Sequence, residues 1–391
     1  MLRRVPRTHV SIAGHHHGAF YVTGWSGFWL ALALTLSLAA LRGRSVLMQA
    51  AIAAAAAAVY FSIVAVVRRR TGRETLVYYH HILVFLAVGA GLGALAGQPV
   101  LAFLDITVCG LALFTAVARI GCLMVGCCHG RPAQHGIVYG PEHRRHGVPA
   151  YLVGQDLIPV QALEALGCAV LTVITTVAVL TAAAPGTAFT IFIAGYALLR
   201  FGLEWLRGDL ARRYAHGLSE AQLISLALAV GVGAGGVTGV LPGGGWTLVP
   251  AAILIAAAAL TIAGWVPGRR ELLAPVHVHE LAHRVGRLEL SESGRVITTV
   301  TSRGLTVSMG ETEQYAHYSL SAGVPLSDES GRQLAALVLW ICRDDAEPEL
   351  IEGGGGVLHV ITPRAAGAHA ASPGGHAASP GGQWAVLGSN Q

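Results

Sequence analysis

The segment from Arg119 to Arg131 gathers the side chains of this sequence that are best suited to chemistry. It holds two arginines, three cysteines and one histidine, with Gly121, Gly126 and Gly130 spaced between them. It begins where a long apolar run ends, and ionisable residues at the end of a membrane span usually serve a substrate, an ion or a partner. Glycines let a backbone or a ligand approach closely. These residues indicate an anionic ligand, and a phosphate-bearing lipid is the first substrate class to consider.

The elements that must position this segment are membrane helices. Of the 391 residues, 53% are hydrophobic and 12% are charged, whereas a soluble domain averages about 25% charged residues. A helix needs about 20 apolar residues to span a bilayer. Such runs lie near residues 19–41, 45–67, 78–97, 99–118, 158–183, 186–206, 219–241 and 246–266. The sequence therefore predicts an all-α polytopic membrane protein with seven or eight transmembrane helices.

Charge and cysteine content argue against two other classes of protein. The net charge of +5 comes from arginines alone, because the sequence contains no lysine. These arginines sit at the ends of apolar runs and form no continuous basic stripe, so no nucleic-acid partner is expected. The six cysteines do not fall into regular pairs, which argues against a disulfide framework.

Composition divides the chain into four parts. The three histidines of the first part are either metal ligands or a polar tip, and we favour the tip. The last part repeats His-Ala-Ala-Ser-Pro-Gly-Gly, a low-complexity composition typical of disorder. In order, the parts are a basic, histidine-containing lead (1–18), a transmembrane domain (19–266) with a polar loop (119–157), a soluble α/β appendage (268–363) and a disordered tail (364–391).

The appendage shows soluble patterning. A glycine-containing turn between two short apolar runs is typical of a β-hairpin, and two segments have helical patterning. The expected elements are a helix around 277–290, a hairpin from Val296–Val300 and Leu305–Met309, a helix at 330–343 and a strand at Val357–Thr362.

Polar residues at three span ends are expected to converge. Gln161 and Glu164 open the fifth span, and Arg200, Glu204 and Arg207 close the sixth. Arg200 and Glu204 are four residues apart, so they share one helix face. If the spans alternate in direction, these residues meet the end of the fourth span, which carries Arg119. His80 and His81, at the start of the third span, belong to the same side of the membrane.

Taken together, these residues resemble the prolipoprotein diacylglyceryl transferase family over roughly residues 20–241. The specificity of the resemblance lies in the ordered set of motifs and not in any single one. The matching residues are Arg119-Ile120-Gly121 through Gly130-Arg131, then Pro159, Gln161 and Glu164, then Arg200 and Glu204, and finally Gln222 and Ser225.

The chain departs from the family pattern at four places. Cys122 stands where the family has an asparagine, Ile158 replaces a histidine and Leu163 replaces a tyrosine. His80-His81-Ile82 stands where the family has histidine-glycine-glycine. A divergent transferase that uses a phospholipid with another acceptor is therefore the alternative function.

The resemblance implies transfer of a diacylglyceryl group from phosphatidylglycerol to a lipobox cysteine of a prolipoprotein, in the bacterial plasma membrane. Arginines would hold the phosphate and stabilise the leaving group. No cofactor and no metal are expected. The expected catalytic residues are His80, Arg119, Arg200 and Glu204, and the expected substrate-binding residues are Gly121, Cys122, Gly126, Gly130, Arg131, Gln161, Glu164 and Arg207.

Several of these roles have alternatives. The base that deprotonates the acceptor thiol could be His80, His81 or His129, and the resemblance favours His80. Glu204 more plausibly orients Arg200 than acts as a base. Arg119 could also extend to the membrane interface. Gln161 and Glu164 could instead satisfy free backbone donors where the fifth span begins.

Two further constellations suggest other classes of function. The spacing of Cys122, Cys127, Cys128 and His129 matches no standard zinc pattern, so packing or redox-sensitive thiols are the alternatives. His279-Glu280-Leu-Ala-His283 fits a zinc-protease motif, but it lies in the appendage and not in an apolar helix. A membrane zinc protease and a non-enzymatic lipid-binding or transport protein are thus less favoured.

The sequence gives two different indications of membrane orientation. Arginines are concentrated in the N-terminus, 68–73, 119–157, 207–213 and the tail, and the positive-inside rule places these segments in the cytoplasm. The family resemblance implies a site at the outer leaflet, with loop 119–157 facing outward.

Overall fold

The computed structural model describes most of the chain as a helical membrane domain followed by a small sheet-containing unit. Seven helices in the described part are long and apolar enough to cross a membrane, and an eighth apolar helix is shorter. The expectation of a multi-pass membrane protein is therefore confirmed. The described residues are 8–71, 78–146, 148–149, 152–209, 214–263, 272, 275–288, 297–311, 314–322, 326, 328–342 and 348–363.

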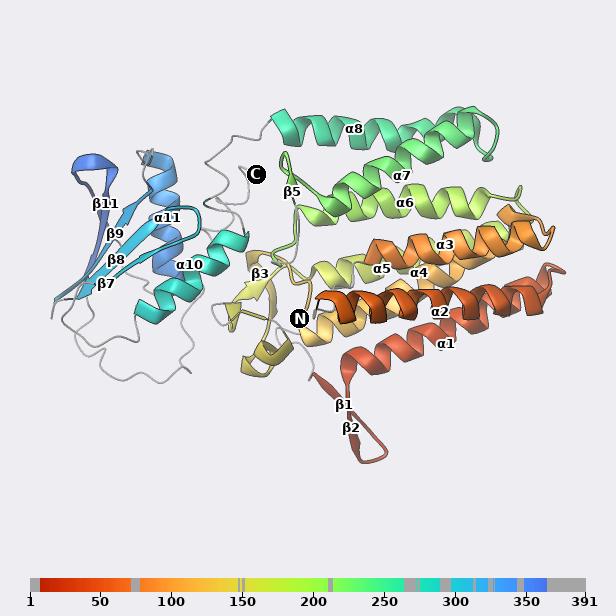
Figure 1. Cartoon of the computed structure of the whole chain (residues 1–391), viewed down its shortest axis with the longest axis horizontal. Helices are drawn as coiled ribbons and strands as arrows, with labels where there is room; N and C mark the ends of the chain where they lie inside the picture. Colours follow the sequence, from red (N-terminus) through yellow and green to blue (C-terminus); the bar gives the residue numbers. More distant parts are fainter. Residues whose placement is uncertain are drawn as a thin grey trace.

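The eight helices lie side by side and successive helices run in opposite directions (Figure 1). Helix α4 is the centre of the bundle, since it packs against α1, α3, α5 and α6. In its apolar, membrane-spanning stretch, 72% of the residues are buried. The helices are α1 (Ala19–Leu41), α2 (Val46–Thr71), α3 (Tyr78–Leu95), α4 (Val100–Val125), α5 (Val160–Leu180), α6 (Thr187–Glu204), α7 (Glu220–Val237) and α8 (Leu248–Ala263).

Small residues allow α4 to approach α1 closely. A Cβ atom at Gly121 would lie 2.0 Å from Oγ1 of Thr23, and one at Gly110 would lie 2.6 Å from Cγ2 of Thr35. Close backbone packing through small residues is a main source of helix association in membranes. Gly121 therefore faces α1, and its nearest neighbours belong to the helix interface.

Helix α4 continues to Val125, beyond the point where the sequence suggested that the polar loop begins. Gly126 ends the helix in the left-handed conformation, with φ of 82°, and its N–H donates to the carbonyl of Cys122. Arg119 is consequently a buried residue inside the last turns of the helix. An arginine can occupy this depth because a carboxylate from another helix pairs with it, as described below.

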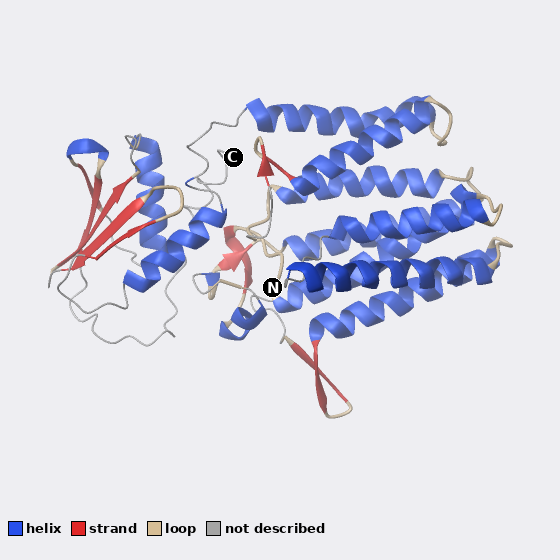
Figure 2. Cartoon of the chain, in the orientation of Figure 1, coloured by secondary structure: helices blue, strands red, loops and turns tan. Residues whose placement is uncertain are grey.

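Short strands and a 3-10 helix lie at one end of the bundle (Figure 2). The N-terminal hairpin carries the three histidines, which are exposed on its second strand. Ser219 caps the start of α7, and Gln222 completes the capping box. These elements are β1 (His9–Ile12), β2 (His15–Gly18), β3 (Pro132–Val138), η1 (Pro141–His146), β4 (Asp156–Leu157), β5 (Tyr214–Ala215) and β6 (Leu218–Ser219).

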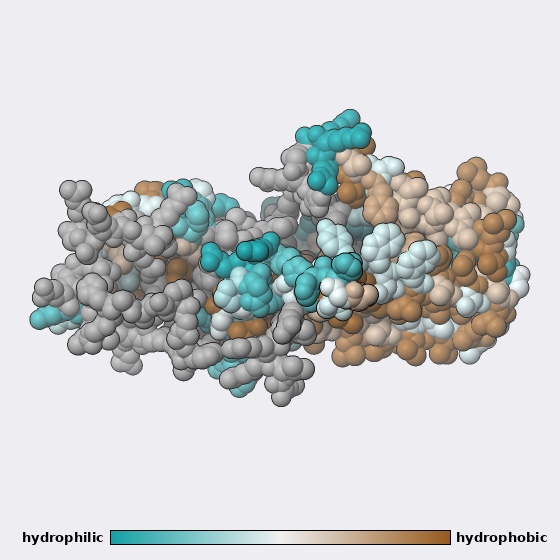
Figure 3. All heavy atoms as spheres, turned by 90° about the horizontal axis from the view of Figure 1, so that it is seen from below, coloured by the Kyte–Doolittle hydropathy of each residue, from teal (hydrophilic) through white to brown (hydrophobic). Residues whose placement is uncertain are grey.

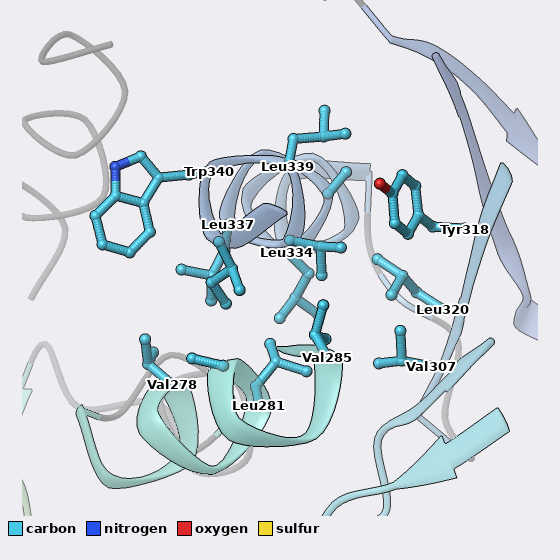
Figure 4. Packing of buried hydrophobic residues seen from close by; sticks show 14 of the residues in the cluster. Val278, Leu281, Val285, Val307, Tyr318, Leu320, Leu334, Leu337, Leu339 and Trp340 are labelled. Carbon is cyan, nitrogen blue, oxygen red and sulfur yellow. The ribbon is translucent and has the colours of Figure 1, made fainter. Parts of the chain in front are cut away.

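The C-terminal unit is an antiparallel sheet of five strands, in the order β10-β11-β9-β8-β7, with α10 and α11 on one face. Apolar side chains of both helices pack against the sheet (Figure 4). The predicted hairpin is confirmed as β7 and β8, with Gly304 at a φ of 75° in the turn. The elements are α10 (Pro275–Leu288), β7 (Ile297–Val300), β8 (Thr306–Glu311), β9 (Tyr315–Ser321), α11 (Asp328–Cys342), β10 (Glu349–Glu352) and β11 (Leu358–Pro363).

The core of this unit continues into the loop that follows α4. Tyr139, Val148, Leu152 and Leu157 belong to the same buried cluster as the apolar residues of α10 and α11. The unit therefore lies against the end of the bundle that carries this loop. Figure 3 shows apolar surface over the helices and hydrophilic residues gathered towards that end. The predicted tail, 364–391, lies outside the described residues.

Candidate active site

A buried carboxylate in the first turns of α5 holds two arginines from neighbouring helices. Oε2 of Glu164 lies 2.9 Å from Nε of Arg119 on α4 and 3.6 Å from Nη1 of Arg200 on α6. The hydroxyl of Tyr196 donates a hydrogen bond of 2.9 Å to Oε1 of the same carboxylate. All four residues are buried. Glu164 thus joins three helices at one end of the bundle.

The chain of charges continues along the end of α6. Nη2 of Arg200 lies 2.6 Å from Oε1 of Glu204, and Nη1 of Arg207 lies 3.3 Å from the same oxygen. Arg207 also donates two hydrogen bonds of 2.7 Å to the carboxylate of Asp209. We call Arg119, Glu164, Arg200, Glu204, Arg207 and Asp209 the ion-pair cluster.

Local sequence spacing explains half of this cluster. Arg200 and Glu204 are one helical turn apart on α6, and Arg207 follows three residues later. The other half depends on the alternation of the spans, which brings the end of α4 and the start of α5 to the same place. The structure therefore brings together the arginines and glutamates that the sequence predicted to converge. Their catalytic or binding roles stay predictions.

Two glycines clamp the segment after α4 to the end of α6. Gly130 forms an isolated antiparallel bridge with Arg207. A Cβ atom at Gly130 would lie 2.2 Å from the carbonyl oxygen of Ile158, and one at Gly208 would lie 2.7 Å from the carbonyl oxygen of Gly130. Arg131, the next residue, donates from Nε to the carbonyl of Arg207 at 3.4 Å. The clamp holds the cysteine-containing turn beside the ion-pair cluster.

Side chains from the polar loop and from the start of α5 satisfy carbonyls at the end of α4 and just after it. The last carbonyls of a helix have no partner within the helix. The hydroxyl of Tyr139 and Nε2 of His143 each approach one of these carbonyls at 3.1 Å, and Nε2 of Gln161 donates at 2.8 Å. The accepting carbonyls belong to Leu123, Met124 and Cys127, respectively. Gln161 thus positions this turn, and our sequence interpretation missed the parts played by Tyr139 and His143.

At the start of α3, the structure turns Tyr79 inward and His80 outward. The hydroxyl of Tyr79 hydrogen-bonds the hydroxyl of Ser225 on α7, and its ring lies 5.6 Å from that of Tyr196. The exposed His80 has Nε2 4.0 Å from a carboxylate oxygen of Glu220. His81 instead packs its ring 3.9 Å from that of Tyr60 on α2.

Tyr79 and Tyr196 are therefore site residues that sequence reasoning missed. Tyr196 lies four residues before Arg200, so helical spacing alone places both on one face. Tyr79 differs from His80 by one position, which is a rotation of about 100° on a helix. The contact of His80 is with Glu220, which lies outside the ion-pair cluster, and the predicted role of His80 as a base stays a prediction.

The three thiols of the Cys122–His129 segment lie close together. Nη1 of Arg119 is 3.9 Å from Sγ of Cys122. Hydrogen bonds from Cys122 and Cys127, helped by the nearby guanidinium groups, hold the pKa of the Cys128 thiol well below its usual range. Burial lowers the pKa of His129. The described residues contain no group of three or more histidine, cysteine, aspartate or glutamate side chains arranged to hold a metal ion.

The zinc-protease-like motif has a structural contact in the appendage. The carboxylate of Glu280 accepts a hydrogen bond of 2.8 Å from the backbone N–H of Ser302 and a second from the hydroxyl of the same residue. This contact ties α10 to the turn between β7 and β8. The side chain of His279 lies outside the described part of the chain, and the side chain of His283 is exposed.

Comparison with known proteins connects this geometry to a family. The family described as prolipoprotein diacylglyceryl transferase has a sequence model that matches residues 11–237. The chain belongs to this family. The matched residues contain helices α1 to α7 and every member of the ion-pair cluster, and they exclude α8 and the C-terminal unit.

Individual relatives match a shorter part of the chain. Phosphatidylglycerol–prolipoprotein diacylglyceryl transferases of three strains of Dehalococcoides mccartyi are each 29% identical over 127 residues. This match covers 32% of the chain and 46% of each relative, so the chain spans about half the length of these curated relatives.

Proposed function

We propose that this chain transfers a diacylglyceryl group from phosphatidylglycerol to the lipobox cysteine of a prolipoprotein in the bacterial plasma membrane. The observation that carries the proposal is the buried ion-pair cluster, built from α4, α5 and α6 within the part of the chain that matches the family. A phosphodiester headgroup needs cationic donors at the membrane interface, and arginine offers five N–H donors in a planar fork.

The glutamates orient the arginines without using all their donors. Glu204 lies 2.6 Å from Nη2 of Arg200, and Glu164 lies 3.6 Å from Nη1, on the other side of the guanidinium group. Within the described residues, Nε of Arg200 has no hydrogen-bond partner, although it is buried. A buried donor without a partner is costly, and a phosphate oxygen would satisfy it. Arg131, which is partly exposed, would add a positive charge beside the ion-pair cluster, in which every arginine already faces a carboxylate.

The reaction would proceed by displacement at carbon. The acceptor thiolate would form a C–S bond to the diacylglyceryl group while the bond from carbon to the phosphate oxygen breaks, and glycerol phosphate would leave. Arg119 and Arg200 would stabilise the charge that develops on this leaving group. His80, with Glu220 beside it, would take the thiol proton at the rim of the bundle.

The test uses the purified full-length protein with phosphatidylglycerol vesicles and a peptide that carries a lipobox cysteine. We expect a thioether-linked diacylglyceryl peptide, detected by mass, and its loss in Arg119→Ala and Arg200→Ala. Undiminished transfer in both variants would reject this site. Transfer should also fail when the peptide cysteine is replaced by serine.

One observation favours a second candidate, in which the same lipid donor serves a different acceptor. The thiol of Cys122 lies beside Arg119 where the family carries an asparagine. The same assay separates the candidates if it includes a competing small thiol and a membrane protein fraction as acceptors. Consumption of phosphatidylglycerol that depends on Arg200 but not on the lipobox peptide would favour the second candidate.

A further inference from the structure

We infer that Cys122 and Cys128 form a reversible oxidative modification site, in which a peroxide or a small disulfide oxidises the two thiols to an intramolecular disulfide. This inference is independent of the transfer reaction proposed above. It concerns the three thiols of the Cys122–His129 segment, which lie beside the ion-pair cluster and enter none of the bond-forming and bond-breaking steps proposed above.

The fold of the turn brings these thiols together. Gly126 ends α4 in the left-handed region, and Cys128 follows with a φ of 56°, a conformation that residues other than glycine rarely adopt. Such strain persists only where surrounding contacts impose it. Here the clamp at Gly130 and the hydrogen bond from Gln161 to the carbonyl of Cys127 hold the turn against the last turn of α4.

The three sulfur atoms are within hydrogen-bonding reach of one another. Cys122 and Cys127 both donate to the sulfur of Cys128, while Cys127 also approaches the carbonyl of Cys122 at 3.9 Å. The guanidinium groups of Arg119 and Arg207 add positive charge near Cys128. This environment favours a thiolate at Cys128, and the thiolate is the form that attacks oxidants.

Access differs among the thiols in a way that suits a two-step oxidation. Cys128 and Cys127 are partly exposed, whereas Cys122 is buried. A reagent can therefore reach Cys128 first, and Cys122 needs only to contact Cys128 in order to resolve the oxidised sulfur. Cysteine pairs of this kind, one reactive and one resolving, are typical of redox-sensitive sites.

The chemistry balances with a peroxide as the oxidant. The Cys128 thiolate attacks one peroxide oxygen, which gives a sulfenic acid and releases hydroxide. The Cys122 thiol then attacks the sulfenic sulfur, so that an S–S bond forms and water leaves. Over both steps the two thiols lose two electrons and two protons, and the peroxide is reduced to two waters. A thiol reductant reverses the process by disulfide exchange.

Geometry favours Cys122 over Cys127 as the resolving residue. Disulfides usually join residues whose Cα atoms are roughly 4.4–6.8 Å apart, whereas adjacent residues have Cα atoms about 3.8 Å apart. A bond between Cys127 and Cys128 would therefore distort the turn. A bond from Cys122 to Cys128 instead closes the turn onto the helix that it already contacts.

The test is thiol mapping on the full-length protein, both in native membranes and after purification in detergent. The protein is treated with a stoichiometric amount of hydrogen peroxide, its free thiols are alkylated under denaturing conditions, and its peptides are identified by mass. We expect a cross-linked peptide containing Cys122 and Cys128, the loss of two alkylatable thiols and the return of both after treatment with dithiothreitol.

Variants locate the bond and provide a matched control. Cys122→Ser and Cys128→Ser should each abolish the cross-link. Cys127→Ser should retain it, as should Cys168→Ser, which removes a buried thiol elsewhere on α5. The inference is overturned if wild-type protein keeps all its thiols, if the bond joins Cys127 to Cys128, or if Cys128 is oxidised while Cys122 stays free.

Discussion

Two buried carboxylates at opposite ends of the bundle are held in different ways. Asp105, near the start of α4, accepts hydrogen bonds of 2.6 and 2.8 Å from the backbone N–H groups of Gly186 and Phe189, where α6 begins. Glu164 is held by two arginine side chains and a tyrosine hydroxyl.

The difference in partners separates a structural carboxylate from one suited to a site. Backbone donors at a helix start are fixed, and the positive end of the helix dipole already favours the charge of Asp105. Arginine side chains have further donors to offer, so the partners of Glu164 can also bind a ligand. Burial of a charge does not by itself distinguish the two cases, but the kind of partner does.

The largest expected effect comes from removing the charge of Glu164. In Glu164→Gln, the buried Arg119 loses its carboxylate partner, which should destabilise the protein by about 3–5 kcal/mol. Asp105→Asn keeps one acceptor oxygen for the backbone donors, and we expect a loss of about 1–3 kcal/mol. Unfolding in detergent, followed by circular dichroism, measures both losses. Equal losses of stability would show that arginine partners and backbone partners make the two carboxylates equally important for folding.

Removing the cation of Arg200 tests whether the arginine partners of Glu164, unlike the backbone partners of Asp105, take part in the transfer reaction. We expect Arg200→Ala to lower the rate of diacylglyceryl transfer by about 10²–10³-fold, because a preorganised donor to the leaving group is lost. Arg200→Lys should recover only part of this rate, since a single ammonium cannot contact both glutamates and a phosphate. Asp105→Asn is the control. Its transfer rate per folded molecule should match that of the unmodified protein.

The role of His80 is open to a pH test. If His80 takes the acceptor proton, His80→Gln should slow transfer by about 10²-fold at neutral pH. The loss should shrink as the pH rises past about 8.5, because a free thiol then ionises without help. His81→Gln is the matched control, since His81 packs on Tyr60. A loss that is independent of pH would assign His80 a structural role.

A smaller effect should come from the glycine clamp. In Gly130→Ala, the added Cβ would meet the carbonyl oxygen of Ile158 at 2.2 Å, so the turn must shift, at a cost of about 1–3 kcal/mol. Gly231→Ala, on α7, is the control because it would meet no atom within 4 Å. Unfolding midpoints of the two variants measure the difference. An unchanged midpoint in Gly130→Ala would show that the close approach of Gly130 to Ile158 does not stabilise the turn.

Much of this arrangement could be predicted from the sequence because it follows from helical spacing. The pairing of Arg200 with Glu204 is a matter of one helical turn, and the approach of Glu164 follows from alternating spans. Hydropathy could not place the end of α4. A charged residue such as Arg119 lowers the hydropathy of the segment, so by hydropathy the apolar run ends just before it. The compensating Glu164 lies on another helix, so only tertiary structure reveals that the helix continues.

Single-residue rotations and small strands were harder to predict. Tyr79 and His80 are both plausible polar residues, and the choice of which faces inward depends on how α3 packs against α7. Strand β9 was not predicted, although its buried residues alternate as Ala316, Tyr318 and Leu320. That alternation is the signal that could have identified it.

The contact between the C-terminal unit and the loop after α4 has a consequence for membrane topology. The N-terminal hairpin, this loop, the β5–β6 hairpin and the C-terminal unit all lie at the same end of the bundle (Figure 1). Among the described residues, the opposite end carries the connections between helices, such as 42–45 and 96–99. Of the described residues outside the eight helices, most therefore lie on one side of the membrane. Protease digestion of sealed vesicles, read at residues 275–363, would thus reveal which side of the membrane carries the ion-pair cluster.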